Sequence, residues 1–502
     1  MLKKNIIANY FGQFYAIIIG IVMLPFYLKY LGAEAYGLVG FFALMQSWMM
    51  LLDMGISPTL SREVAKVKNE TDNIVRLKFI NLLHSLEFIF IIVSLFISLL
   101  IIINSNLITT SWIRLQTLDI DIVSYCISLM GAMIGLRLLS SLYRSGIVGS
   151  EEQVWLNKAN SIIVTLKFVG VILVLHFISS DIKYFFEYQM IVTILEFFLY
   201  SFKFYNIMNI GKFKLYFSYL DIKPILPFAM GIAYTSGIWI FLTQLDKFIL
   251  SGILPLSEYG YFALVGMVAN AVLAIADPIG KAILPRMVSL HKNGQNEKMI
   301  ELYKNSTQLV AIIVFSVTVI MSSFSYEFLY SWTGDIKASL WGENILFWYL
   351  LGNALLSMVA FTYYLQFTFG KLRLHIRYNT VSAIVSIPLI IWSANEYGAL
   401  GVSLVWFSIR LISFLFWTPV VHNKFAKGIH RDWLMKDILP IFLSSLAFIL
   451  MFNYLDISFD YNRGAIFGLL LLLGMFVLVS NILASSYARN IVVNFIKDKY
   501  VK

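Results

Sequence analysis

The chain contains one cysteine, Cys126, and few charged side chains. A single cysteine excludes an intrachain disulfide and a Cys-based metal site. Charged residues make up 13% of the chain, whereas soluble domains carry about a quarter. No Gly-x4-Gly-Lys-[Ser/Thr] run and no His-Glu-x-x-His run occurs, so we expect neither ATP hydrolysis by the chain itself nor a zinc-protease site. The sequence predicts no metal and no cofactor.

Apolar stretches of transmembrane length dominate the sequence. Hydrophobic residues reach 59%, and the mean hydropathy is +0.79. A helix crosses about 30 Å of hydrocarbon with roughly 20 residues. We therefore predict an all-α integral membrane protein with about 14 transmembrane helices; dropping the weakest spans gives the alternative of 12. The predicted spans are 5–28, 36–56, 79–103, 122–143, 159–178, 184–204, 225–250, 259–279, 306–324, 345–369, 376–393, 398–420, 438–455 and 465–483.

The basic residues orient the predicted bundle. If Lys3 is placed in the cytoplasm and the sides alternate, most of the 38 Lys and Arg fall in the inner loops and at both termini. This asymmetry is a strong positive-inside signal. It predicts a multi-pass membrane protein with both termini in the cytoplasm. The net charge of +10 is then explained by anionic membrane lipids rather than by nucleic acid.

A repeated motif divides the predicted helices into two groups. Glu34-Ala-Tyr36-Gly37 opens the second span and Glu258-Tyr259-Gly260 opens the eighth, while Gln46, Asp53 and Arg62 recur as Asn270, Asp277 and Arg286. An even number of spans separates the copies, so both cross in the same direction. We predict two six-helix lobes related by a parallel repeat, as in transporters that rock around a central site. The expected parts are an N-lobe (1–205), a cytoplasmic linker (206–223), a C-lobe (224–421), and two additional helices with a cytoplasmic tail (422–502).

Several motifs resemble the polysaccharide transporter family, which includes O-antigen and related repeat-unit flippases. They are Asn9-Tyr-Phe-Gly-Gln13, the run from Pro25 to Gly32, Glu34-Ala-Tyr-Gly37, the run from Asp53 to Glu63, and Leu245-Asp-Lys-Phe-Ile249 continuing into Leu256–Gly260. This family belongs to the multidrug/oligosaccharidyl-lipid/polysaccharide exporter superfamily. The resemblance covers the first 12 predicted spans. It implies that an undecaprenyl-pyrophosphate-linked oligosaccharide moves from the inner to the outer leaflet of a bacterial cytoplasmic membrane. It also implies membrane lipids and glycan polymerase machinery as partners, and H⁺ or Na⁺ as a coupling ion.

Charged residues inside the predicted spans are the candidate substrate ligands. Each costs at least ~2.5–3.5 kcal/mol at the bilayer centre, so it must face protein or water. Helical spacing aligns them with other polar residues in stripes that we expect to line a lumen. An Arg fork or a Lys ammonium there would bind a pyrophosphate; alternatively these cations neutralise Glu196 or Glu87. Arg137 could also snorkel to headgroups, and Trp406 could stack on sugar rings or serve as a belt residue. The candidates are Lys167, Arg410, Arg137, Glu196, Asn160 and Trp406.

Three further pairs are candidate gate residues: Asp53 with Arg62, Asp277 with Arg286, and Asp246 with Lys247. In one interpretation an Asp of one lobe pairs with the Arg of the other and closes the inner side. In the other, each Asp binds backbone donors at a helix end. Asp246 and Lys247 are interpreted as an outer latch or as an interfacial pair.

Two other classes of protein compete with the repeat-unit flippase. A cation-coupled multidrug exporter of the same superfamily would favour an acidic lumen, whereas Lys167 and Arg410 balance the acids here. A membrane glycan polymerase or ligase usually carries a long outer loop, and the longest expected outer loops have about twenty residues. A lipid scaffold without transport would not need charged stripes. The sequence therefore predicts a transporter rather than an enzyme.

Overall fold

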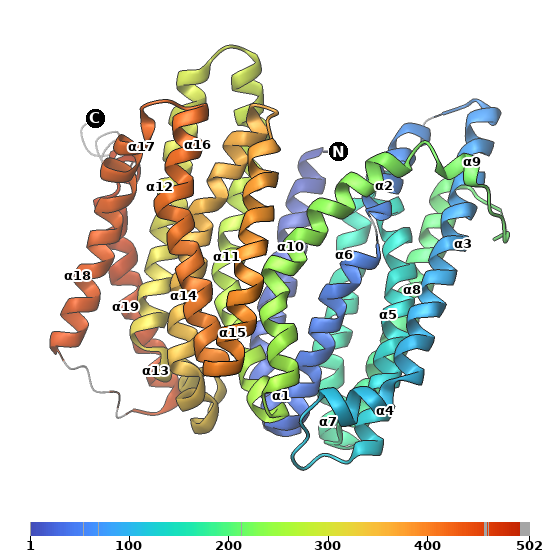
Figure 1. Ribbon diagram of the computed structural model, residues 1–502, viewed down its shortest axis with the longest axis horizontal. Helices are drawn as coiled ribbons and strands as arrows, with labels where there is room; N and C mark the ends of the chain where they lie inside the picture. The colour runs from blue at the N-terminus through green and yellow to red at the C-terminus, as the bar shows by residue number, and fades with distance from the viewer. Residues whose placement is uncertain are drawn as a thin grey trace. The chain divides into compact units, whose positions relative to one another are not determined.

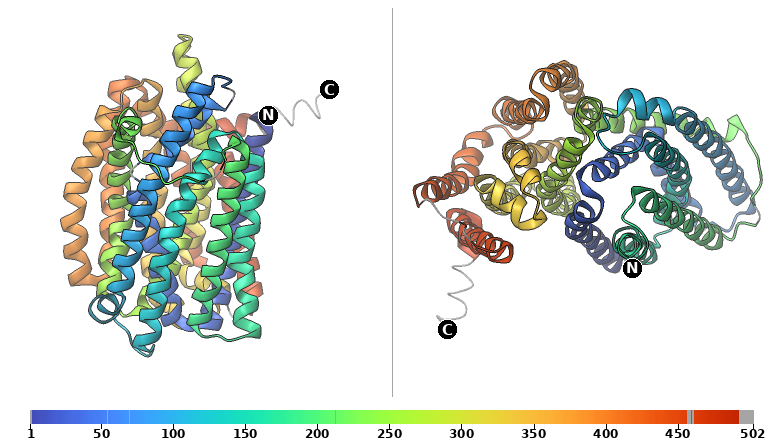
Figure 2. Two further views of the ribbon diagram at one scale, coloured as in Figure 1. Left: turned by 90° about the vertical axis from the view of Figure 1, so that its right-hand side faces the viewer. Right: turned by 90° about the horizontal axis from the view of Figure 1, so that it is seen from below.

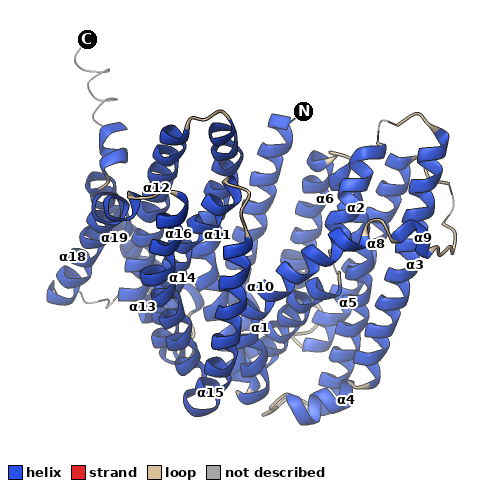
Figure 3. Cartoon of the chain, turned by 45° about the horizontal axis from the view of Figure 1, so that its top comes forward, coloured by secondary structure: helices blue, strands red, loops and turns tan. Residues whose placement is uncertain are grey.

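Helices form the whole regular structure of the part of the chain that can be described (Figure 3). The computed structural model describes residues 2–53, 55–68, 70–211, 213–455, 459 and 461–491. Within these ranges the β-type pairing consists of one isolated bridge between Arg114 and Pro255. The end of the predicted cytoplasmic tail lies outside the described residues. The all-α prediction is confirmed.

The described residues contain 12 helical segments long and apolar enough to cross a membrane. Two of these segments are broken by a glycine. Gly32 interrupts α1 with φ 78° and ψ 170°, and Gly398 interrupts α15 with φ 59° and ψ −143°. Such backbone angles are essentially restricted to glycine. Each broken segment contains two of the spans predicted from the sequence, so the prediction of about 14 crossings is confirmed.

The first compact unit comprises Met1–Gly260. Helices α3, α5 and α8 pack side by side in it, and α1 contacts α6 and α10 (Figures 1 and 2). An apolar core of this unit includes Leu60, Leu83, Leu142 and Phe204. Its elements are α1 (Leu2–Leu52), α2 (Ile56–Val67), α3 (Asn73–Ile103), α4 (Ser105–Leu107), η1 (Ile108–Trp112), α5 (Ile120–Gly149), α6 (Gln153–Thr165), η2 (Leu166–Gly170), α7 (Val171–Phe177), α8 (Ile182–Met208), α9 (Tyr219–Ile222) and α10 (Leu226–Ile253).

The second compact unit comprises Tyr261–Lys502. Its most deeply buried spans are α12 and α14, and α18 and α19 both pack on α12. Its elements are α11 (Leu256–Lys292), which begins in the first unit, α12 (Asn296–Ser323), α13 (Ser325–Thr333), α14 (Ile336–Thr368), α15 (Arg373–Ile412), η3 (Ser413–Trp417), α16 (Thr418–Phe425), α17 (Ile429–Asp432), η4 (Trp433–Ile438), α18 (Leu439–Leu455) and α19 (Arg463–Ala484).

Helix α10 is assigned to one part of the chain by its contacts and to the other part by the sequence repeat. The sequence assigns α10 to the start of the second lobe, and in the structure α10 packs on α1 and α2 of the first unit. A helix that belongs to one repeat can pack mainly on helices of the other repeat. A boundary drawn from contacts therefore need not coincide with a boundary drawn from the repeat. The predicted lobe boundaries therefore stay predictions.

Hydrogen bonds between helices fasten the last two helices to the second unit. Asn481 of α19 donates to Ser316 of α12 and to Ser445 of α18, each at 2.9 Å. In a lipid environment such bonds help hold helices together, because lipid tails are as apolar as the helix surface. Although the sequence suggests an appendage, α18 and α19 share a core with α12 that includes Ile320, Phe452 and Leu470.

Candidate functional site: a cationic cluster inside the first unit

Lys167 lies on a π-helical turn in the middle of a membrane span. The turn η2 interrupts the segment Gln153–Phe177. The Lys167 carbonyl oxygen accepts hydrogen bonds from Gln189 Nε2 at 2.8 Å and from the Tyr27 hydroxyl at 3.2 Å. Backbone groups inside a membrane must find partners within the protein, and π-turns occur frequently at functional sites. Side chains from α8 and α1 therefore hold the turn that presents Lys167.

The Lys167 ammonium forms an ion pair with Glu196 of α8. Lys167 Nζ lies 2.5 Å from Glu196 Oε2, and their side chains are 16% and 13% exposed. This contact agrees with the alternative interpretation of the sequence, in which Lys167 neutralises Glu196. A role of either residue in substrate binding stays a prediction.

Arg137 of α5 is half-buried and lies within electrostatic reach of Lys167. Its guanidinium donates to Gln46 Oε1 of α1, and its Cζ lies 5.1 Å from the centre of the Phe42 ring. Arg137 Nε is buried and, among the described residues, has no hydrogen-bond partner. A buried guanidinium N–H without a partner can donate a hydrogen bond to an oxygen atom of a ligand. Arg137 thus faces the protein interior rather than lipid.

Arg144 completes the cluster, and the sequence interpretation did not include it. It lies seven residues after Arg137, which is two turns along the same face of α5. It is exposed and lies within electrostatic reach of Lys167, together with Arg137 and Glu196. The spacing of Arg137 and Arg144 was the signal that could have found it. We call Arg137, Arg144, Lys167 and Glu196 the cationic cluster; its formal charge is three positive against one negative.

Asn160 stands apart from these contacts. It is half-buried on α6, seven residues before Lys167 on the same helical face. This position agrees with the predicted polar stripe, and its role in binding stays a prediction.

The second unit contains a cationic group of its own, described separately. Arg410 is 5% exposed, and its Cζ lies 4.1 Å from the Trp406 ring centre. Trp406 Nε1 donates to Asn353 Oδ1 at 3.0 Å, and Asn353 Nδ2 donates to the Ala269 carbonyl at 2.8 Å. The π-turn η3 follows directly. Trp406 is therefore fixed against Arg410 and is not a lipid-facing belt residue.

The first predicted gate pair makes local contacts. The Asp53 carboxylate accepts hydrogen bonds from Ser57 N at 3.3 Å and from the Ser57 hydroxyl, as the helix-end interpretation expects. Asp53 lies between the spans Ala8–Met49 and Asn73–Ile103; burial raises the pKa of its carboxyl, and the Ser57 bonds oppose that shift. Arg62 Cζ lies 4.7 Å from the Phe228 ring centre of α10. The gate role of both residues stays a prediction.

The remaining gate candidates have mixed surroundings. Asp277 lies within electrostatic reach of Tyr364, while Arg286 is exposed. Lys247 Nζ lies 3.4 Å from Asp246 Oδ1 and donates to the Thr243 carbonyl at 2.8 Å. These neighbours on α10 thus pair with each other, and a latch role for them stays a prediction.

A loop of the first unit, predicted from the sequence to lie on the outer side, makes contacts that sequence reasoning missed. Glu34 Oε1 and Oε2 accept hydrogen bonds from Gln116 N at 2.6 Å and Thr117 N at 2.9 Å. Trp112 Nε1 donates to Ser251 Oγ at 3.0 Å, and Ser257 Oγ donates to Gln116 Oε1 at 2.5 Å. This loop therefore binds both the bend of α1 and the turn between α10 and α11. We call these contacts the outer clamp.

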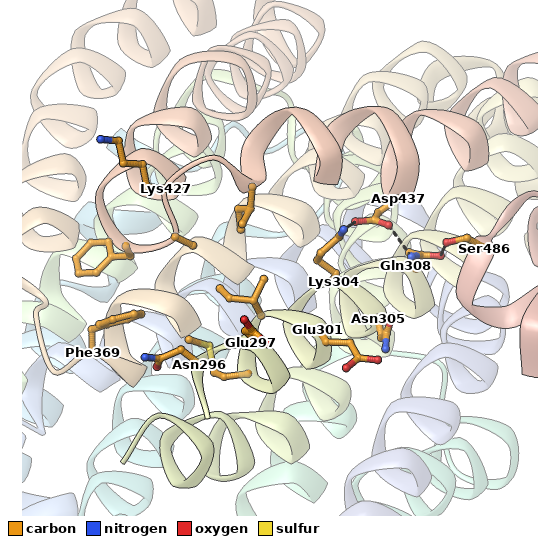
Figure 4. A pocket seen from close by; sticks show the side chains of 15 residues that line it. Asn296, Glu297, Glu301, Lys304, Asn305, Gln308, Phe369, Lys427, Asp437 and Ser486 are labelled. Atoms are coloured by element: carbon orange, nitrogen blue, oxygen red, sulfur yellow. Dashed lines mark hydrogen bonds and ion pairs between the residues drawn. The ribbon is translucent and has the colours of Figure 1, made fainter. Parts of the chain in front are cut away.

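A polar cavity of about 690 Å³ lies in the second unit at the ends of α12, α16 and α17 (Figure 4). Lys304 Nζ lies 3.3 Å from Asp437 Oδ2, and Gln308 Nε2 donates to Asp437 Oδ1 at 2.8 Å. The Ser485 hydroxyl donates to Gln308 Oε1 at 2.5 Å. In the close-up, Lys304 and Gln308 of α12 reach Asp437 of η4, and Gln308 also reaches Ser486 of the segment after α19. Their groups bind one another, which assigns them a role in holding α18 and α19.

Solved structures share the fold. The structure titled lipid II flippase MurJ in an inward closed conformation aligns with a TM-score of 0.73 and 18% identity, over 97% of this chain and 99% of that one. A multidrug resistance MATE family transporter of the MOP superfamily, in an inward-facing conformation, gives 0.61 and 11%, over 81% and 95%. The Vibrio cholerae MATE transporter VcmN gives 0.55 and 15%, over 84% and 96%. The molecule therefore has the fold of the MOP-superfamily transporters.

The family follows from the sequence of the first half. Residues 2–291 match the model of the polysaccharide biosynthesis protein family. The chain belongs to this family, which confirms the resemblance seen in the motifs. No curated protein matches the chain. It is thus a multi-pass membrane protein of a polysaccharide biosynthesis family with a transporter fold.

Proposed function

We propose that the protein is a flippase that moves an undecaprenyl-pyrophosphate-linked oligosaccharide, such as an O-antigen repeat unit, from the inner to the outer leaflet of a bacterial cytoplasmic membrane. The family and the fold support a transporter of polysaccharide precursors. The observation that carries the substrate class is the charge of the cationic cluster, with Arg137, Arg144 and Lys167 against Glu196. An excess of cations inside a membrane span needs an anion, and a pyrophosphate supplies it.

The roles of the residues follow from their contacts. Arg137 has an unsatisfied Nε and a fork that suits two phosphate oxygens. Lys167 exchanges its partner Glu196 for the phosphate, which leaves Glu196 to take up a proton or to bind a coupling cation. Arg410 and Trp406 of the second unit are the further proposed substrate ligands, with the ring stacked on a sugar. Asp53, Arg62, Asp277, Arg286, Asp246 and Lys247 serve as gate residues.

The membrane potential favours the proposed direction. Moving about two negative charges outward across an inside-negative potential of 100 mV releases roughly 4.6 kcal/mol, at ~2.3 kcal/mol per charge. Net export then needs no other ion, although antiport of H⁺ or Na⁺ at Glu196, Glu87 or Asp53 would add to it. Glycan polymerase machinery would consume the exported unit.

A cation-coupled multidrug exporter is the competing function, since MATE transporters share the fold. Such an exporter binds cationic drugs, and the positive excess of the cationic cluster opposes this. Arg144 and Lys167 would repel a cationic drug held beside Glu196. A polymerase or ligase is disfavoured further, because the chain has a transporter fold.

Proteoliposomes that contain a fluorescent undecaprenyl-pyrophosphate oligosaccharide test the proposal. We expect the wild-type protein to move the lipid to the opposite leaflet, where an impermeant quencher reports it. Arg137→Gln should slow flipping at least tenfold, since a lost hydrogen bond to a charged group costs ~1.5–3 kcal/mol. Lys158→Gln, at an exposed position on α6, is the matched control. Flipping at the same rate in Arg137→Gln and wild type, or transport of cationic dyes alone, would contradict the proposal.

A further inference from the structure

The first unit has a groove that is lined by none of the residues of the cationic cluster. It has a volume of about 1380 Å³ and is lined by side chains of α3, α5, α8 and the segment that follows α8. We call it the α3–α5–α8 groove. Its wall is mostly apolar and includes Ile91, Leu139, Leu195, Phe198 and Phe202. Leu195, Phe198 and Phe202 are 46%, 62% and 76% exposed. In a membrane-spanning helix such side chains face acyl chains.

The depth of the groove matches one leaflet. From Leu195 to the end of α8 at Met208 the groove follows almost four helical turns, roughly 20 Å at 1.5 Å per residue. Half of a bilayer with its headgroups is also about 20 Å thick. The groove opens at the end of α8, where Asn206 and Asn209 line it with exposed amides. We call this opening the mouth of the groove. The groove is thus apolar in its depth and polar at the membrane surface.

Basic side chains gather at this mouth. Arg76 Nη2 donates to the Met208 carbonyl at 3.3 Å, which places a guanidinium beside Asn209. Lys214 is exposed and follows Phe213, a residue of the groove wall. The nearby carboxylates are already engaged: Glu87 Oε1 accepts from the Tyr205 hydroxyl at 2.6 Å, and Asp221 Oδ2 accepts from the Tyr216 hydroxyl at 3.3 Å. The mouth therefore offers amide and cationic donors to an anion.

The segment over the mouth is docked onto α3. The Phe213 ring lies 6.2 Å from the His84 ring, the Phe217 ring lies 5.5 Å from the Phe88 ring, and Ser218 N donates to Ser85 Oγ at 3.1 Å. Leu215, Tyr219 and Leu220 on this segment remain exposed. Exposed aromatic and aliphatic residues next to lysines are typical of chain that lies in a membrane interface.

We propose that the α3–α5–α8 groove binds one anionic phospholipid of the cytoplasmic leaflet. An acyl chain lies along Leu195, Phe198 and Phe202, and the phosphate lies at Asn206, Asn209, Arg76 and Lys214. The site is separate from the cationic cluster and holds a resident lipid rather than the transported one. Its occupant packs against α3, α5 and α8 and so stabilises the first unit.

Native mass spectrometry of the full-length protein in detergent tests this site. Phosphatidylglycerol and phosphatidylcholine with the same acyl chains are titrated separately, and undecaprenyl phosphate forms a third arm. We expect one tightly retained phosphatidylglycerol and weaker retention of phosphatidylcholine. Lys214→Glu should lower the retention of phosphatidylglycerol at least about fivefold, the effect of one basic residue at a lipid surface, and should leave phosphatidylcholine unchanged. Leu195→Trp should fill the groove and remove the retained lipid.

Matched controls separate the groove from the general membrane surface. Ile162→Trp replaces another lipid-facing residue, 60% exposed on α6, and Lys158→Glu reverses another exposed charge. Both should retain phosphatidylglycerol as the wild type does. Equal retention of the two phospholipids would overturn the proposal, as would unchanged retention in Leu195→Trp. Retention of undecaprenyl phosphate alone would also overturn it and would assign the groove to the transported lipid.

Discussion

Gly37 and Gly260, the glycines of the two Tyr-Gly motifs, pack backbone against backbone. A Cβ on Gly260 would lie 2.9 Å from Gly37 N and would overlap the Ala33 carbonyl, and a Cβ on Gly37 would overlap the Leu256 carbonyl. The repeated motif therefore marks the place where α1 meets the start of α11. Glycine is needed there because no side chain fits between the two helices.

Gly260→Val should separate these helices. Overpacking a close contact costs about 1–3 kcal/mol, so we expect the outer clamp next to it to open. A cysteine at Ser257 would then react faster with an impermeant maleimide, and the background is low because Cys126 is buried. Gly231→Val is the control, since a Cβ there meets nothing within 4 Å. Equal labelling of Ser257→Cys alone, with Gly260→Val and with Gly231→Val would count against this role of the motif.

Cross-linking the outer clamp should stop transport reversibly. The pair Gln116→Cys and Ser257→Cys joins positions whose side chains already touch, and a cleavable bis-maleimide spans them without strain. If the outer side must open to release the substrate, the cross-linked protein does not flip the labelled lipid, and cleavage of the linker restores flipping. Each single-cysteine variant treated with the same reagent serves as a control. Continued flipping in the cross-linked protein would show that the clamp does not open.

Asp53 offers a choice between two roles that substitution can separate. Asn keeps an oxygen for the Ser57 donors, and burial already disfavours the charged carboxylate, so a helix-end role predicts normal flipping by Asp53→Asn. Asp53→Ala should lower the free energy of unfolding by ~0.5–2 kcal/mol, the usual effect of losing such a cap. A gate that depends on the charge predicts the opposite, with Asp53→Asn inactive at unchanged thermal stability.

Gln308 of α12 forms hydrogen bonds with the segments that flank the last two helices. Replacing it with Leu removes the Gln308 partner of Asp437 Oδ1 and of the Ser485 hydroxyl, which should cost ~1–3 kcal/mol. Thermal unfolding followed by a dye or by scanning fluorimetry in detergent should show a lower midpoint for Gln308→Leu. Glu301→Ala, at an exposed position on the same helix, should leave the midpoint where it is. A midpoint unaltered by Gln308→Leu would mean that apolar packing alone holds α18 and α19.

The sequence predicts the architecture well and the site in part. Apolar run length, basic loops and the repeat led to a membrane bundle of about 14 helices. The Tyr-Gly motifs indicated the repeat, whereas the contact between Gly37 and Gly260 is visible only in the structure. Helical spacing also aligned Lys167 and Glu196 with polar stripes, and the two side chains meet.

The rest depended on three-dimensional contacts. Arg144 lies just beyond the predicted span 122–143, although its spacing from Arg137 places it on the same face of α5. The outer clamp depends on Glu34 binding backbone N–H groups far along the chain, and no side-chain pattern encodes such partners. The π-turn at Lys167 likewise arises from the hydrogen bonds of Tyr27 and Gln189.

The measurement that tests the account most directly is flipping by Lys167→Met/Glu196→Met. Replacing both partners of a buried ion pair with apolar residues is often neutral or stabilising, so the double variant should fold and keep its thermal midpoint. If Lys167 binds the pyrophosphate, flipping of the labelled lipid falls at least tenfold, while Lys158→Met flips like the wild type. Wild-type flipping by the double variant would contradict the account and would leave Lys167 and Glu196 a structural pair.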